Sequence, residues 1–97
     1  MKREKIKTEI IKEDKIERDG CEYRYTLECK KSMKVASYRL PLYSVKICFK
    51  SEDGDSTECS SGELFTDVGR ALVFYRRLVD NLATPIDLPY IVEDELV

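Results

Sequence analysis

The sequence predicts an α+β fold, in which an antiparallel sheet of about four strands, built from two hairpins, is covered by one amphipathic helix and followed by a short C-terminal helix. Two turn signals, Asp19-Gly20 and Asp53-Gly54, each separate segments in which apolar and polar residues alternate. From about residue 66 to 82 the apolar residues recur instead at three- and four-residue steps. Strands first and a helix afterwards are typical of the α+β class.

The length of 97 residues predicts a single domain, with the sheet at about 4–61, the helix at about 66–82 and a C-terminal segment at 85–97. An apolar fraction of 42% with 37% charged residues is typical of a globular protein. No apolar run approaches the ~18–20 residues of a membrane helix, and the start MKREKIKTE lacks the apolar block of a signal peptide. We therefore expect a cytoplasmic protein outside the membrane.

The first hairpin is predicted around Asp19-Gly20, where both turn positions need a positive φ. A regular first strand places four residues on one face: Ile6, Thr8, Ile10 and Ile16. The second strand alternates most clearly, with one face made of Cys21, Tyr23, Tyr25, Leu27 and Cys29. A two-residue turn places Ile16 opposite Tyr23. The same register places Ile10 opposite Cys29, so that apolar residues meet along the hairpin.

The second hairpin is predicted around Gly54, and its first strand has one apolar face made of Tyr43, Val45, Ile47 and Phe49. A two-residue loop would bury Glu58 beside Phe49, which is energetically costly. A three-residue loop, with Gly54 in the left-handed conformation, avoids that burial and pairs Ile47 with Cys59. In this register Cys48 and Cys59 face opposite sides of the sheet and cannot form a disulfide.

The helix is expected to begin at a Thr66 cap and to end before Pro85, because the residue before proline disfavours the helical conformation. Val73 and Phe74 extend its apolar surface beyond one stripe. Pro89 fits the first turn of the C-terminal helix. The pattern does not determine residues 31–42. The predicted buried stripe consists of Val68, Ala71, Leu72, Tyr75, Leu78, Val79 and Leu82.

Nothing in the sequence indicates catalysis, a metal site or a cofactor. The chain has no histidine, and its four cysteines do not form a C-x-x-C pair. It also lacks a glycine-rich phosphate loop. The acidic run Glu93-Asp94-Glu95 is interpreted as a solvated end of the chain. We expect reduced thiols that pack as small apolar side chains, and a protein that is not an enzyme.

Charge is unevenly distributed along the chain. Residues 1–50 carry fourteen Lys and Arg against eight Asp and Glu, whereas residues 51–97 carry three against eleven. One interpretation is weak nucleic-acid binding on a basic sheet surface, but Tyr23 and Tyr25 share their face with Leu27 and are expected to pack in the core rather than stack on bases. Docking of the two oppositely charged halves in a homodimer is a further hypothesis.

The C-terminal segment contains the candidate protein contacts, Leu88, Ile91, Val92 and Leu96. These apolar residues lie on a short segment that a small core need not cover fully, so they suit contact with another protein. The alternative is that the segment closes the domain against the long helix, and the sequence favours this slightly. The overall interpretation is a small protein-binding or regulatory module, with nucleic-acid binding as the alternative.

The run LVDNLATPIDLPYIVEDEL at 78–96 resembles the ending of a family of short, functionally uncharacterised proteins from clostridia and related Firmicutes. The matching positions are Pro85, Leu88, Ile91, Val92, Glu93, Asp94 and Leu96. The order of strands followed by one helix is similar too, although Pro89 and residues 31–42 depart from the pattern. The resemblance implies a bacterial cytoplasmic protein and no particular activity.

Overall fold

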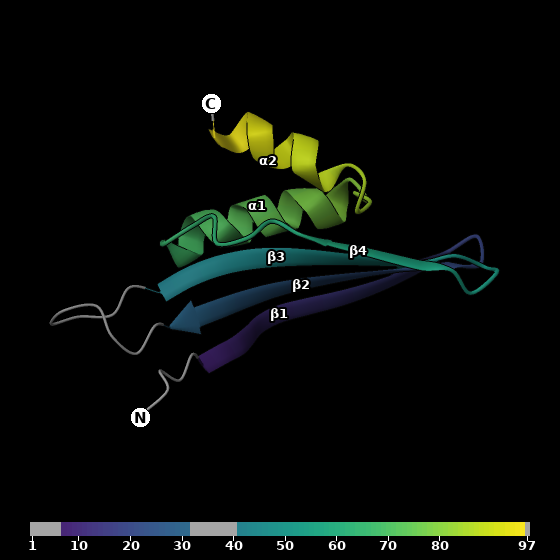
Figure 1. Cartoon of the computed structure of the whole chain (residues 1–97), viewed down its shortest axis with the longest axis horizontal. Coiled ribbons are helices and arrows are strands. Elements are labelled where there is room, and N and C mark those ends of the chain that lie inside the picture. Colours follow the sequence, from purple (N-terminus) through teal and green to yellow (C-terminus); the bar gives the residue numbers. More distant parts are fainter. Residues whose placement is uncertain (1–6, 32–40, 97) are drawn as a thin grey trace, which may run out of the picture.

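The computed structural model describes residues 7–31 and 41–96, which form an α+β fold of four strands and two helices (Figure 1). The elements, in chain order, are β1 (Lys7–Arg18), β2 (Cys21–Lys31), β3 (Pro41–Lys50), β4 (Ser56–Ser60), α1 (Val68–Asp80) and α2 (Leu88–Leu96). Most of the stretch 31–42, which the sequence pattern does not determine, lies outside the described residues. Its last part belongs to β3, which begins at Pro41 opposite Lys31.

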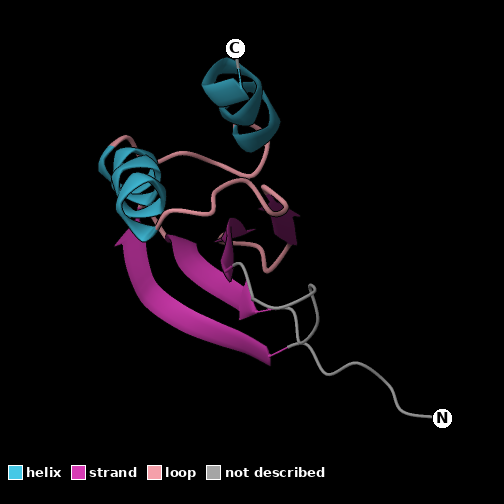
Figure 2. Ribbon diagram, turned by 90° about the vertical axis from the view of Figure 1, so that its left-hand side faces the viewer, coloured by secondary structure: helices cyan, strands magenta, loops and turns pink. Residues whose placement is uncertain are grey.

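The strands form one antiparallel sheet in the order β1-β2-β3-β4. Both helices lie on the same side of this sheet, with α2 farther from the strands than α1 (Figures 1 and 2). The main contacts of α1 with the sheet are made to β2 and β3. The helix therefore covers the middle of the sheet, and the edge strand β1 extends beyond it. We call the face toward the helices the inner face and the opposite one the outer face.

The hydrophobic core lies between the inner faces of β2 and β3 and the helices. Every second residue from Tyr25 to Cys29 and from Tyr43 to Ile47 is buried there, as the alternation of the sequence predicts. The buried core residues are Tyr25, Leu27, Cys29, Tyr43, Val45, Ile47, Phe65, Ala71, Phe74, Tyr75, Leu78, Ala83 and Leu88. Neither described helix is long and apolar enough to cross a membrane.

The first hairpin has the predicted turn but not the predicted register throughout. Asp19 and Gly20 have φ values of 54° and 80°, and Ile16 pairs with Tyr23 as expected. Ile10, however, pairs with Glu28, because a β-bulge at Ile11 shifts the register between residues 10 and 12. The extra residue reverses the alternation, so Ile10 and Ile16 do not share a face and Ile10 is 58% exposed.

The second hairpin confirms the three-residue loop. Ile47 pairs with Cys59, and Gly54 has a φ of 98°. The Ser51 N–H donates to the Asp55 carbonyl oxygen at 2.7 Å, which closes the loop around residues 52–54. All four cysteines are free thiols.

The long helix begins one residue later than predicted. Asp67, not Thr66, is the N-cap, and its carboxylate accepts a hydrogen bond from the Arg70 N–H at 2.9 Å. The predicted buried stripe is also partly wrong, because Val68 and Leu72 are exposed and Leu82 lies beyond the end of α1 at Asp80, with a φ of 51°. With α1 over β2 and β3, the stripe that meets the core consists of Ala71, Phe74, Tyr75 and Leu78. Val68 and Leu72 lie on a side of the helix outside this stripe.

Candidate interaction surface between β1 and α1

An open groove of about 490 Å³ lies between β1 and α1. It exists because α1 packs over β2 and β3, so that the inner face of β1 has no helix directly on it. Lys12 and Asp14 belong to this inner face, since they pair with the buried Leu27 and Tyr25. The lining residues are Lys12 and Asp14 from β1 and Leu72, Val73, Tyr75, Arg76, Val79 and Asp80 from α1.

Tyr75 connects the two walls of the groove. Its hydroxyl lies 2.7 Å from Asp14 Oδ2 and 3.1 Å from the Tyr25 carbonyl oxygen, and it shares its one proton between these acceptors. Burial, together with the hydrogen bond to the Asp14 carboxylate, raises the pKa of the Tyr75 hydroxyl well above its ordinary value. The hydroxyl is therefore a neutral donor that anchors the helix to the edge strand.

Apolar surface lies on the helical wall of the groove. Val73 is 62% exposed and Leu72 is exposed as well, although both are large aliphatic side chains. Lys12 and Asp14 on the strand wall carry charges of opposite sign, as do Arg76 and Asp80 on the helix. The groove thus combines an apolar strip with balanced charges, which suits a polypeptide better than a strongly charged ligand.

The strand wall also has a free backbone edge. β1 is an edge strand of twelve residues, and among the described strands it pairs only with β2. The other edge strand, β4, has five residues. A long edge strand presents unpaired N–H and C=O groups that can pair with another chain. In this protein that edge adjoins the apolar strip on α1.

The predicted contact residues of the C-terminal segment lie mostly against the core. Leu88 is fully buried, and Ile91 and Val92 are partly buried against the core. Leu96 is the last residue of α2, which an ion pair of 3.1 Å between Arg77 and Glu95 holds to α1. Among the described side chains of this segment, which do not include that of Leu96, the large exposed apolar ones are Ile86 and Tyr90. Contact between α2 and another protein stays a prediction.

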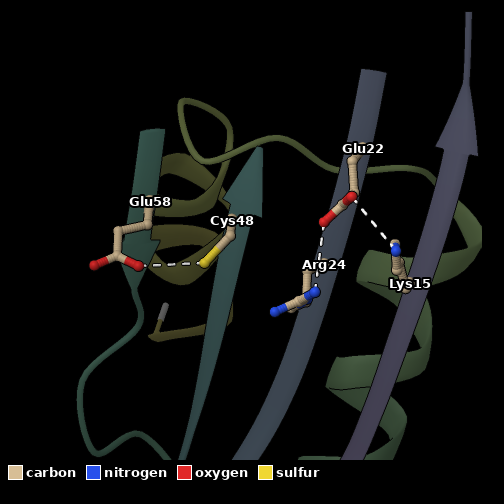
Figure 3. Close-up of polar contacts among 5 residues, drawn as sticks. All are labelled: Lys15, Glu22, Arg24, Cys48 and Glu58. Carbon is tan, nitrogen blue, oxygen red and sulfur yellow. Dashed lines mark hydrogen bonds and ion pairs between the residues drawn. The ribbon is translucent and has the colours of Figure 1, made fainter. Parts of the chain in front are cut away.

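The outer face of the sheet carries ion pairs (Figure 3). Glu22 lies 3.5 Å from both Lys15 and Arg24. Glu58 lies 3.9 Å from Lys46, which the figure does not draw. The Cys48 thiol donates to Glu58 Oε2 at 3.2 Å. Burial, followed by this hydrogen bond, raises the pKa of the Cys48 thiol.

Acidic partners thus lie beside the basic residues of the outer face, whereas the aromatic rings belong to the other side of the sheet. Tyr25 and Tyr43 are buried on the inner face. Tyr23 packs edge-to-face on Phe49 with ring centroids 5.1 Å apart. The prediction that the sheet tyrosines pack in or against the core is confirmed for these three.

The groove is not among the features predicted from the sequence, although one signal for it is present. Inner positions of β2 are apolar, whereas the inner positions of β1 opposite them carry Lys12 and Asp14. Charged residues in a strand facing the helical layer indicate that this part of the layer is open. This signal lies between the turn and the bulge, where the predicted register already places Lys12 opposite Leu27 and Asp14 opposite Tyr25, so it is present in the sequence.

A comparison with protein-family models matches residues 3–96 to a family of unknown function, DUF6514. The chain belongs to this family. The matched region contains both walls of the groove, so the DUF6514 region includes the whole candidate surface. Comparisons with curated proteins and with solved structures give no match.

Proposed function

We propose that this DUF6514 protein is a non-enzymatic protein-binding module that recognises an extended segment of another chain along β1. The observation that carries the proposal is the free twelve-residue edge of β1 beside a groove with exposed Leu72 and Val73. Strand addition gives affinity through main-chain hydrogen bonds, and adjacent pockets give specificity through alternate side chains. This protein has both parts side by side.

The position of the groove determines which side chains of an added strand would lie near α1. Side chains of such a strand would alternate between the inner and outer faces of the sheet. Those on the inner side would lie across the groove from Leu72 and Val73, whereas those on the outer side would extend the charged outer face. We therefore propose a partner segment whose inner side chains meet both the charged residues of β1 and the apolar strip on α1.

A capture experiment with matched variants tests the proposal. The immobilised protein is incubated with lysate of its bacterial host, and Val73→Asp is compared with Ile86→Asp, an equally drastic change at a residue that is 74% exposed outside the groove. We expect a specific protein to be retained by the wild type and by Ile86→Asp but lost with Val73→Asp. Hydrogen exchange of β1 should slow in the purified complex. Equal retention by both variants would overturn the proposal.

A cytoplasmic setting belongs to the same proposal, and it is supported by the four free thiols, which are typical of a reducing compartment. The alternative, nucleic-acid binding on the basic sheet surface, gains no support from the outer face, where Lys15, Arg24 and Lys46 lie in ion pairs. Binding of single-stranded nucleic acid at low salt would revive that alternative.

A further inference from the structure

We infer that the chain which adds to β1 is a second copy of this protein, paired antiparallel about a two-fold axis between Ile10 and Ile11. The inference rests on the proposed function, because it identifies the partner of the same edge. It is carried by the bulge at Ile11 and by the charges on either side of it.

A two-fold axis perpendicular to a sheet imposes a condition on the strand. Each residue must lie opposite a residue of the second copy that points to the same face. In a regular strand, two residues separated by an odd number of positions point to opposite faces, so an axis between two residues is excluded. The bulge removes this restriction in β1. Glu9 and Lys12, three positions apart, pair with Cys29 and Leu27 and therefore both lie on the inner face.

The register about the bulge is complementary at each position from Thr8 to Glu13. On the inner face Glu9 lies opposite the second copy's Lys12, and symmetry repeats this pair. Ile10 lies opposite the second copy's Ile11, and both side chains are exposed in the single chain. On the outer face Thr8 lies opposite the second copy's Glu13, because these residues pair in the single chain with Lys30 and Thr26. Opposite charges and apolar pairs facing each other stabilise neighbouring strands.

Other symmetric registers centred near the bulge are worse. An axis through Glu13 or Asp14 places two identical carboxylates opposite each other, which is destabilising. An axis through Ile11 places Ile10, on the outer face, opposite Lys12, on the inner face, so the pleats of the two strands do not match. Among the registers centred from Ile10 to Asp14, the bulge thus favours one register of self-pairing.

The dimer would join the grooves of the two copies. Each copy contributes four strands to a continuous sheet, and the two-fold axis places both α1 helices on the same face. The seam between the two β1 strands then lies between these helices. Leu72 and Val73 of each copy face the seam from its two sides, which places the exposed apolar strips of both chains in one shared groove.

The test exchanges the two charges that the register brings together. Glu9→Lys and Lys12→Glu each place like charges opposite one another twice, and we expect either change to weaken self-association by about tenfold or more. The double variant Glu9→Lys/Lys12→Glu restores opposite charges and should associate like the wild type. A mixture of the two single variants should form a heterodimer. Sedimentation over about a hundredfold range of concentration at low salt measures each case.

Both side chains are exposed, so the folded chain should tolerate the changes. Glu63→Lys, an equal charge change at an exposed residue outside β1, is the control and should associate like the wild type. A chain that stays monomeric overturns the inference, as does a dimer that the double variant fails to restore. Capture of a different protein that depends on Val73 would then still support strand addition, whereas capture independent of Val73 would overturn the proposed function itself.

Discussion

Tyr75 lies where the helix and the edge strand meet, and its hydroxyl is the polar link between them. The aromatic ring of Tyr75 packs in the core, while its hydroxyl donates to Asp14 and to the Tyr25 carbonyl oxygen. Removing only the hydroxyl therefore separates the polar link from the packing. Phenylalanine at this position leaves a carboxylate and a carbonyl without their donor.

We expect Tyr75→Phe to lower the free energy of unfolding by about 1–2 kcal/mol, the cost of losing a partly buried hydrogen bond to a charged group. Tyr90→Phe is the matched control, because Tyr90 is 68% exposed and its change should have almost no effect. Urea denaturation of both variants and the wild type measures the difference. Equal stabilities would show that the contact with Asp14 contributes nothing.

Tyr25 predicts how stability changes at alkaline pH. Its hydroxyl donates to the Ala83 carbonyl oxygen at 2.8 Å. Burial, followed by electrostatic interactions with Tyr23 and Asp87, raises the pKa of Tyr25 to about 12. The folded state favours the protonated hydroxyl, so this stabilisation is fully present below the unfolded pKa of about 10 and is lost as pH rises from about 10 through 12.

Over that range the wild type should lose about 2–3 kcal/mol more stability than Tyr25→Phe, which has no hydroxyl to ionise. The variant should be less stable at neutral pH and should show a flatter decline above pH 10. Denaturation at a series of alkaline pH values measures both curves. Parallel curves would contradict the raised pKa of Tyr25.

At the scale of the elements, substitutions at the start of α2 distinguish a helix that closes the fold from one that contacts a partner. Leu88 is fully buried, whereas Ile86 is exposed two residues earlier. We expect Leu88→Ala to cost about 2–4 kcal/mol, as deletion of buried methyl groups does, and Ile86→Ala to stay within about 0.5 kcal/mol. Thermal and chemical denaturation give both values. If the two changes cost the same, α2 is not needed by the fold and becomes available to a partner.

The elements also show why some registers are predictable from sequence. The hairpin turns depend on local chemistry, since Gly20 and Gly54 each supply a positive φ, and both turns agree with the prediction. The bulge at Ile11 does not follow from a turn. Its one local sign is the apolar doublet Ile10-Ile11, which a regular strand would divide between both faces. Every prediction that crosses the doublet, such as Ile10 opposite Cys29, is therefore wrong.

For the whole molecule, the position of the helix over the sheet decides where the candidate surface lies. The periodicity of residues 66–82 predicts a helix with a buried stripe, but it does not say which strands the stripe meets. The helix lies over β2 and β3 because their inner faces are apolar without interruption, whereas β1 presents Lys12 and Asp14. The groove is a consequence of this asymmetry, which the predicted register of the first hairpin already contains, because Lys12 and Asp14 lie between the turn and the bulge.

The same asymmetry predicts two levels of protection against amide hydrogen exchange. Amides of β2, β3 and α1 enclose the core and should exchange only when the whole molecule unfolds. The start of β1, from Lys7 to the bulge at Ile11, pairs on one side only and lacks buried side chains among its described ones, so it should open locally and exchange much faster.

Mass spectrometry of exchange at two protein concentrations tests this prediction together with the role of the edge. In dilute solution the segment 7–11 should exchange well before β2. At high concentration its exchange should slow, because the second copy covers the same edge, while β2 and β3 stay unchanged. Glu9→Lys should abolish the dependence on concentration without altering the fast exchange in dilute solution. A segment 7–11 as protected as β2 in dilute solution would contradict the view that β1 is a free edge.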